Sequence, residues 1–132
     1  MNGTFIHAAE TKRDALDWGR LGWISNPAGT GAAQLAIVEG TLFPGKGHDF
    51  HKHPKQEEVL VVLAGTIEQW IGEEKRLLGP GDAAFMPPGT VHASFNIGKD
   101  EAKVLAIFGP CVGDGFETVD MASEAPWKDL RR

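Results

Sequence analysis

Residues 45–65 read GKGHDFHKHPKQEEVLVVLAG, in which three histidines and two glutamates come directly before a run of branched apolar residues. The chain has only five histidines, yet His48, His51 and His53 fall within six positions. His51 and His53 stand two residues apart, so in an extended strand both side chains point to the same side. Two neutral imidazoles with the carboxylate of Glu58 form a mixed nitrogen and oxygen ligand set for a divalent first-row metal. Such a histidine pair also occurs on plain surface loops, so this stretch alone leaves both interpretations open.

The rest of the chain is divided by turn signals into short apolar segments. With 17 glycines and 8 prolines, turn residues recur throughout, and the segments between them are rich in Val, Ile, Leu, Phe and Thr. Short strands separated in this way predict an all-β sandwich or barrel. Helices are expected only near the two ends, at residues 8–18 and 123–130.

The apolar run after Glu58 indicates that both faces of one strand are covered. In the strand 58–64 the side chains alternate between two faces, and both faces are apolar beyond Glu58. One face is expected to line the barrel interior, and the other to meet a second sheet, a terminal arm or another subunit. Three tryptophans outside the main strand block are candidates for this cover: Trp18, Trp23 and Trp127. Packing within one chain would also account for the pattern, but a two-fold homodimer is the commonest oligomer and protects sheet edges, so a homodimer is expected.

Length and composition limit the classes of function. The 132 residues fit one domain with a real core, and 42% apolar with 23% charged residues is ordinary for a globular protein. No apolar run approaches the roughly 20 residues that span a bilayer, and the N-terminus lacks the layout of a secretory signal. A single cysteine, Cys111, excludes an internal disulfide and favours the cytoplasm. The net charge of −5 argues against nucleic acid and anionic membrane as partners.

A second stretch, GDAAFMPPGTVHASFN at residues 81–96, places His92 within a predicted strand. Ser94 and Asn96 share its face, and apolar residues occupy the other face. A histidine between apolar neighbours must be hydrogen-bonded, metal-bound or exposed to water. Taken alone, His92 is explained as a hydrogen-bonded core residue.

Together the two stretches resemble the two motifs of the cupin superfamily. The first fits G-x5-H-x-H-x4-E-x6-G at every fixed position, which are Gly45, His51, His53, Glu58 and Gly65. The second fits G-x5-P-x-G-x2-H-x3-N at Gly81, Pro87, Gly89, His92 and Asn96. The resemblance implies an all-β cupin fold, a double-stranded β-helix (jelly-roll) barrel with short N- and C-terminal appendages. The expected parts of this single domain are an N-terminal arm at 1–32, the barrel at 33–110 and a C-terminal extension packed on the barrel at 111–132.

The resemblance also implies a metal site. By family analogy the four protein ligands of one divalent metal ion per chain (Fe, Mn, Ni, Co or Zn) are His51, His53, Glu58 and His92. Glu57 faces the other way in a regular strand and is assigned to solvent. His48 lies outside the motif and is expected in a loop near the mouth of the barrel. Asn96 is expected to support the fold by hydrogen bonding.

Four ligands leave two positions of an octahedral metal for water, dioxygen or a bidentate substrate. Leu60 and Val62 continue on the face of Glu58, so the surroundings of the metal are expected to be mostly apolar. Five residues of other strands could also contribute, although each is better explained as plain barrel core: Phe50, Trp70, Phe85, Met86 and Phe108. The chain has no tyrosine to act as a general base, and no catalytic residue is assigned. The favoured function is a metal-dependent enzyme of dioxygenase type acting on a small organic substrate. The alternatives are a non-redox isomerase, decarboxylase, cyclase or lyase, and a non-catalytic binding module.

Overall fold

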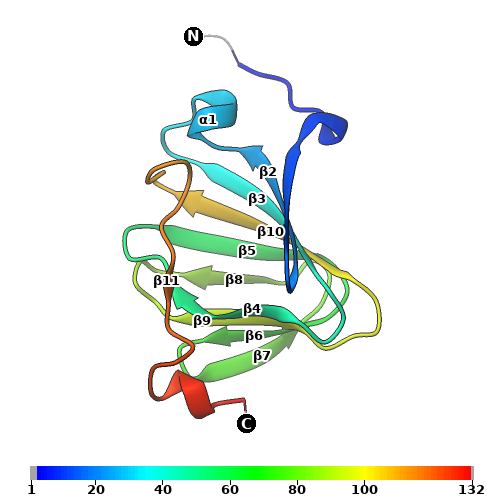
Figure 1. Ribbon diagram of the computed structural model, residues 1–132, viewed down its shortest axis with the longest axis vertical. Helices are drawn as coiled ribbons and strands as arrows, with labels where there is room; N and C mark the ends of the chain where they lie inside the picture. The colour runs from blue at the N-terminus through cyan, green and yellow to red at the C-terminus, as the bar shows by residue number, and fades with distance from the viewer. Residues whose placement is uncertain (1–2, 132) are drawn as a thin grey trace.

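The computed structural model describes residues 3–131, which form two antiparallel sheets around a common interior (Figure 1). The first sheet has six strands in the order β1-β2-β3-β10-β5-β8, and the second has five in the order β11-β4-β9-β6-β7. The strands are β1 (Lys12–Leu16), β2 (Gly19–Ser25), β3 (Ala36–Leu42), β4 (Gly47–Lys52), β5 (Glu57–Ala64), β6 (Ile67–Ile71), β7 (Glu74–Leu78), β8 (Ala83–Met86), β9 (His92–Asn96), β10 (Ala102–Gly109) and β11 (Val119–Asp120). Short helical turns are η1 (Ala8–Glu10), α1 (Pro27–Thr30) and η2 (Trp127–Asp129), and none of the helices described is long and apolar enough to cross a membrane. The prediction of an all-β jelly-roll barrel is confirmed.

The N-terminal residues form strands, so the helix predicted for residues 8–18 is wrong. Only η1 is helical there, and β1 and β2 form a hairpin that pairs along the edge of β3. Main-chain hydrogen bonds to a sheet edge outweigh the weak helical preference of this segment. Near the other end, the helix predicted at 123–130 is reduced to η2. The division at residues 32 and 110 into arm, barrel and extension stays a prediction, although β1 and β2 are continuous with the six-stranded sheet.

Two residues show how the turns between strands are fixed. Gly65, between β5 and β6, has a backbone φ of +83°, and a Cβ there would lie 2.9 Å from the Cβ of Ala102. Both the left-handed conformation and the close approach of β10 require glycine at this position. Asn96, at the end of β9, donates from its side-chain amide to the carbonyl of Leu42 and accepts from the N–H of Gly98. The predicted structural role of Asn96 is confirmed.

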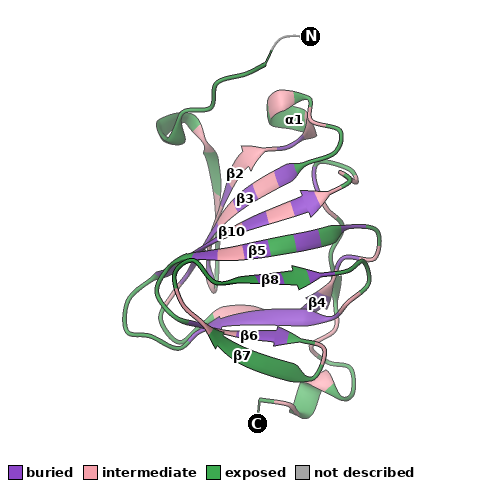
Figure 2. Cartoon of the chain, turned by 180° about the vertical axis from the view of Figure 1, so that it is seen from behind, coloured by how far each residue is buried: buried purple, intermediate pink, exposed green. Residues whose placement is uncertain are grey.

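One end of the barrel interior is an apolar core to which both sheets contribute. Its buried members are Leu42, Leu60, Val62, Ile67, Ala84, Met86, Ala102 and Val104. Strand β5 runs from the other end of the interior, where Glu58 is its first buried residue, into this core. Figure 2 shows the alternation of buried and more exposed residues along β5 and β10. The apolar core therefore anchors the strands whose opposite ends carry polar side chains.

The outer face of the five-stranded sheet is covered by the C-terminal extension. Met121, Trp127 and Leu130 pack against a buried cluster made of Phe50, Trp70, Val91, Ala93 and Phe95. In Figure 1 the extension runs past β11 toward the bottom of the molecule. Phe50 and Trp70 therefore belong to this packed cluster and do not contribute to the surroundings of the predicted metal.

The outer face of the six-stranded sheet has no comparable cover among residues 3–131. Val59 on β5 is 36% exposed, and Phe85 on β8 is 52% exposed. The prediction that tryptophans cover this face is wrong, because Trp18 and Trp23 pack against interior clusters and Trp127 packs on the other sheet. The N-terminal hairpin extends the sheet at its edge instead of lying across it, which leaves the face bare.

Candidate metal centre

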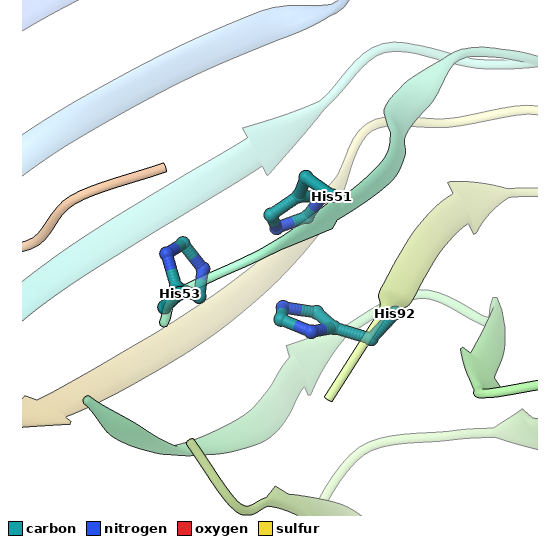
Figure 3. A group of neighbouring side chains, drawn as sticks. All are labelled: His51, His53 and His92. Atoms are coloured by element: carbon teal, nitrogen blue, oxygen red, sulfur yellow. The ribbon is translucent and has the colours of Figure 1, made fainter. Parts of the chain in front are cut away.

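Three histidines from neighbouring strands converge in the interior (Figure 3). His51 lies in β4, His53 follows directly after that strand, and His92 begins β9. The antiparallel register of β4 and β9 places His51 opposite His92. One ligand atom from each of the three rings lies within 4.8 Å of the other two, and all three side chains are buried. Strand pairing thus brings together residues that lie some forty positions apart in the sequence.

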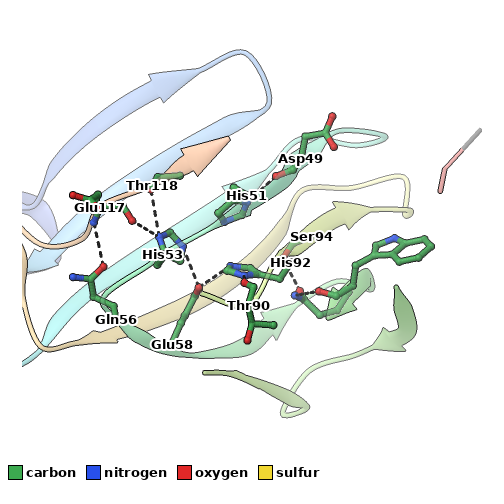
Figure 4. A network of polar contacts seen from close by, with 12 residues as sticks. Asp49, His51, His53, Gln56, Glu58, Thr90, His92, Ser94, Glu117 and Thr118 are labelled. Carbon is green, nitrogen blue, oxygen red and sulfur yellow. Dashed lines mark hydrogen bonds and ion pairs between the residues drawn. The ribbon is translucent and has the colours of Figure 1, made fainter. Parts of the chain in front are cut away.

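Glu58 reaches the same point from β5 in the other sheet. Its Oε1 lies 2.9 Å from Nε2 of His92 and 3.4 Å from Nε2 of His53 (Figure 4). Glu58 is buried and the preceding Glu57 is exposed, so the predicted strand phase is confirmed. Metal bonds of about 2.1 Å at right angles place neighbouring ligand atoms about 3 Å apart, and these spacings fit that geometry.

Backbone carbonyls hold every ring of the cluster in one orientation. Nδ1 of His51 donates to the carbonyl oxygen of Asp49 at 2.7 Å. Nδ1 of His53 and Nδ1 of His92 donate in the same way to the carbonyl oxygens of Glu117 and Thr90, both at 2.9 Å. A carbonyl oxygen can only accept, so Nδ1 carries the proton and Nε2 of each neutral ring presents a lone pair. A second hydrogen bond of this kind is the usual companion of a metal-binding histidine.

The inward-facing atoms of the cluster lack a partner. Glu58 Oε1 and His92 Nε2 are buried and have no proper hydrogen bond within residues 3–131. With a neutral ring, two lone pairs would face each other at 2.9 Å, which is unfavourable unless a cation lies between them or the ring is protonated. A divalent metal ion would satisfy all the inward-facing groups at once. The donor set therefore fits the metal that the sequence predicts.

The local electrostatics favour the protonation states that bind metals. Burial opposes ionisation of Glu58, but the imidazoles of His53 and His92 close beside its carboxylate lower its pKa to about 2. Burial lowers the pKa of His51 well below its ordinary value, and the charges of His48 and His92 lower it further. Near neutral pH the carboxyl of Glu58 is therefore ionised and the ring of His51 is neutral, as metal coordination requires.

A cavity of about 70 Å³ adjoins the cluster between the two sheets. Its walls beyond the cluster are mostly apolar and include Trp18, Leu60, Phe108 and Phe116. Phe116 comes from the C-terminal segment and stacks on Phe108 with the ring centroids 4.2 Å apart. None of the described residues that line the cavity is a lysine or an arginine. The cavity therefore offers polar groups at one place and apolar contact elsewhere.

A larger and more open hollow, of about 550 Å³, lies beside the N-terminal arm and β2. His7, Glu10 and Asp14 are among its lining residues. Within residues 3–131, however, the three buried histidines are the one group of three or more His, Cys, Asp or Glu side chains that converge closely enough to hold a metal ion. The candidate site is therefore the histidine cluster and its smaller cavity.

The position of His48 differs from the sequence-based expectation. It lies within β4 and not in a loop, and its ring forms part of the cavity wall. The ring stacks on His51 with the centroids 3.6 Å apart. Burial, reinforced by the charges of His92 and His53, lowers the pKa of His48 to about 4. His48 is thus a neutral residue of the site near neutral pH.

The walls of the cavity were the part least visible in the sequence. Of the aromatic residues that could have contributed to the pocket, Phe108 lines the cavity, whereas Phe85 lies on the outer face of the sheet. Sequence reasoning missed Trp18 and Phe116, which lie in the β1–β2 turn and the C-terminal segment, outside both motifs. It also missed Ser94 as a lining residue, although its position on the His92 face was a usable signal.

The family model described as Cupin domain matches residues 38–108, which is more than half of the chain and contains all the converging side chains. The chain belongs to the cupin family. This cupin is similar to germin-like protein subfamily 3 member 3 of Arabidopsis thaliana, with 34% identity over 89 residues that span 64% of the chain and 40% of that protein. It is also similar to oxalate oxidase 2 of Hordeum vulgare, with 25% identity over 109 residues that span 76% of the chain and 45% of that protein. The chain thus spans less than half the length of either relative.

Solved structures share the fold at low sequence identity. KdgF from Halomonas sp. superposes with a TM-score of 0.73 and 23% identity, covering 83% of this chain and 96% of that chain. Oxalate decarboxylase from Lactobacillus farciminis, in a formate complex, superposes with a TM-score of 0.77 and 20% identity, covering 87% of this chain and 35% of that chain. At these identities the likeness shows the shared barrel alone. The family and the histidine cluster together support a metal-dependent cupin.

Proposed function

We propose that this cupin binds one divalent metal ion through His51, His53, Glu58 and His92 and acts as an enzyme of dioxygenase type on a small organic substrate. The observation that carries this proposal is the set of buried, unpartnered atoms beside an apolar cavity. A metal ion held there would supply Lewis-acid polarisation of a substrate oxygen and, where the metal is redox-active, a site for dioxygen.

The residues around the ligands restrict the substrate. Phe108 and Phe116 form a flat apolar wall that suits an aromatic or planar molecule and excludes water. The cavity of about 70 Å³ is smaller than the roughly 300 Å³ at which pockets for drug-sized ligands begin. A small and mostly apolar substrate with one or two oxygen atoms is the class that fits.

The scarcity of proton-transfer groups favours oxidative chemistry. Outside the proposed ligands, the polar side chains that line the cavity within the described residues are His48 and Ser94. The Ser94 hydroxyl already donates to Oε1 of Gln69 at 2.5 Å. Isomerases, decarboxylases, cyclases and lyases usually move a proton with a positioned side chain. A non-redox enzyme remains the second candidate because His48 is able to do so.

The names of two similar proteins contain the word oxalate. We do not propose oxalate as a substrate of this chain. A divalent metal together with the Glu58 carboxylate carries one net positive charge, which leaves a dianion only partly neutralised. Within residues 3–131 no lysine or arginine lines the cavity to supply the missing charge. Buried charges require such pairing.

We also propose a cytoplasmic protein that binds neither nucleic acid nor membrane. The single cysteine and the net charge of −5 support this proposal. Cell fractionation tests the location, and a filter-binding assay with duplex DNA tests the nucleic acid.

The experiment for the proposed function starts with elemental analysis of protein purified without chelators. About one divalent metal per chain is expected. Oxygen uptake is then measured with iron-, manganese-, nickel- and cobalt-loaded protein and a panel of β-diketones and catechols. Substrate-dependent uptake supports the dioxygenase, whereas conversion without oxygen supports the non-redox alternative. Ligand binding without any conversion identifies a binding module, and protein that takes up no metal overturns the site.

A further inference from the structure

Three aromatic rings form a stack at the edge of the candidate metal centre. The ring of His48 lies parallel to His51, with a centroid distance of 3.6 Å and an interplanar angle of 12°. Its other side faces Trp18, at 4.8 Å and 14°. All three residues line the cavity. His48 is therefore held one ring thickness from a proposed ligand, with its plane fixed on both sides.

The nitrogen edge of His48 is free to meet a ligand. His51, His53 and His92 each bond a backbone carbonyl, but no side-chain hydrogen bond within residues 3–131 involves His48. Its two faces are covered by the neighbouring rings, so a ligand in the cavity can approach only its edge. Ser94, the other polar residue of the wall, already donates its proton to Gln69.

We propose that His48 orients the substrate by a hydrogen bond from its imidazole edge to an oxygen atom of a small planar ligand. The class that fits is a molecule with one or two oxygen atoms and an apolar body, such as an enol, a β-diketone or a catechol. One hydrogen-bonding group in otherwise apolar walls suits such a ligand better than a sugar, whose many hydroxyls would lose their partners on burial. This inference rests on the proposed function, because the ligand is held beside the metal. His48 also positions the ring of His51, against which it stacks, and Trp18 keeps the ring of His48 in place.

The test compares His48→Phe and His48→Gln in the full chain loaded with cobalt(II), with catechol as the probe. Phenylalanine keeps the stack and removes the hydrogen bond, and glutamine keeps the hydrogen bond and removes the stack. His7→Phe makes the same chemical change at an exposed histidine and serves as the matched control. Metal content, the melting temperature and the visible absorption of cobalt are measured before catechol is titrated.

His48→Phe is expected to keep one cobalt per chain and an unchanged spectrum without catechol, but to bind catechol about tenfold more weakly. His48→Gln is expected to recover part of that loss, and His7→Phe to match the unmodified chain. Equal catechol affinity in His48→Phe overturns the hydrogen bond. Loss of cobalt from both His48 variants also overturns the proposed hydrogen bond, because it would show that His48 is needed to bind the metal itself. A chain that takes up cobalt but not catechol overturns the ligand class, whereas a chain that takes up no cobalt refutes the proposed function itself.

A separate observation concerns the bare outer face of the six-stranded sheet. The strand registers align one row of apolar side chains across four strands, Ile37, Ile107, Val59 and Phe85. A second apolar row, Leu105, Val61 and Ala83, spans three strands and ends at Glu39 on β3. An antiparallel sheet that faces water normally shows polar residues at such positions. A contiguous apolar patch of this kind marks an interaction surface.

The charges at the ends of this apolar face identify its occupant. Glu57 and Lys103 are both exposed and stand at opposite ends of the paired strands β5 and β10. Lys103 makes a loose contact with Glu39, at 3.8 Å. A half-turn about an axis across these strands, in the plane of the interface, brings Glu57 of each copy to the Lys103 end of the other. We infer that a second copy of this chain docks here in a two-fold homodimer, since such an interface requires a self-complementary surface.

The homodimer is tested by sedimentation equilibrium of the full chain between about 1 and 100 µM, a range that brackets micromolar affinity. Val59→Lys, in the centre of the apolar face, is expected to weaken association more than tenfold. Leu77→Lys, at a position that is 63% exposed on β7 of the other sheet, is the matched control and leaves the dimer intact. Glu57→Lys is expected to weaken the dimer, and adding Lys103→Glu to restore it. A monomer at all concentrations, or a dimer that survives Val59→Lys, overturns the inference, and failure of the charge swap overturns the two-fold arrangement.

Discussion

The two ends of the barrel interior are equally buried but are satisfied in opposite ways. At one end Leu42, Val62 and Ile67 belong to one buried apolar cluster, each no more than 2% exposed. At the other end Glu58 and His92 are 4% and 2% exposed, yet their facing atoms have no hydrogen-bond partner. Apolar burial stabilises the first end without help, whereas the second is unfavourable until a cation lies among its ligand atoms. Stability and ligand binding are therefore located at different ends of the same strands.

His92→Ala is expected to have the largest effect on the polar end. Loss of one ligand should weaken metal binding on the order of 1,000-fold, since even the outer-shell partners of ligands contribute 10- to 100-fold. The metal-free protein should also lose stability, by about 1–3 kcal/mol, because the buried ring and its Nδ1 hydrogen bond to Thr90 are removed together with the unpartnered Nε2. Competition with a chelator of known affinity measures the first quantity, and circular dichroism the second. His7→Ala is the control, and unchanged metal affinity in His92→Ala would refute the ligand assignment.

Ile67→Ala is the matching change at the apolar end. Ile67 is fully buried, and its truncation should lower the free energy of unfolding by about 2–5 kcal/mol. The metal affinity of the folded protein should stay unchanged, because the cavity created lies within the apolar core. Urea unfolding in the presence of a chelator and metal titration of the folded protein provide the two values. A loss of metal affinity as large as the loss of stability would show that the two ends are coupled.

Glu58→Gln and Glu57→Gln compare adjacent carboxyls on opposite faces of β5. Glutamine at position 58 keeps an oxygen ligand without charge, so a 10- to 100-fold loss of metal affinity is expected, in the range of other perturbations of a metal ligand. Glutamine at position 57, which is exposed, should leave metal affinity unchanged. Isothermal titration with the same metal salt distinguishes the two variants. The reverse ranking would place the ligand on the outer face of the strand and contradict the structure.

The polar end could be predicted from the sequence because strand geometry determines its spacing. His51 and His53 lie on one side of an extended segment, and alternation in β5 separates Glu58 from Glu57. The pairing of His51 with His92 is a long-range contact, yet the second motif marks its position. These four side chains converge as the motifs imply, while their role as ligands stays a prediction for the experiments above to test.

The walls of the cavity and the edges of the sheets could not be predicted in the same way. Trp18 and Phe116 enter the cavity from a hairpin turn and a C-terminal segment whose places depend on packing between distant parts of the chain. The helix expected at 8–18 is a hairpin because the unpaired edge of β3 offers main-chain hydrogen bonds that no local pattern reveals. His48 is expected in a loop because it lies outside the motif, but β4 includes it, with a register shift between His48 and His51 that the sequence does not show.

The most gradual effect expected is the pH dependence of the metal-free protein. The unfolded chain takes up protons at His48 and His51 below about pH 6.5, whereas the folded chain resists them because both pKa values are lowered, that of His48 to about 4. Stability should therefore fall as the pH drops from 6.5 toward 4. The contribution of Glu58 is complete above about pH 4.5 and is lost as the pH falls toward 2. With chelator present, His48→Phe should flatten the profile between pH 6.5 and 4 by up to about 1.4 kcal/mol per pH unit, the value for one proton. Urea unfolding at half-unit pH steps measures the slope of stability against pH. An identical slope in His48→Phe would mean that His48 takes up its proton equally in the folded and unfolded states. A solvent-exposed ring would behave in that way, whereas a ring stacked between Trp18 and His51 would not.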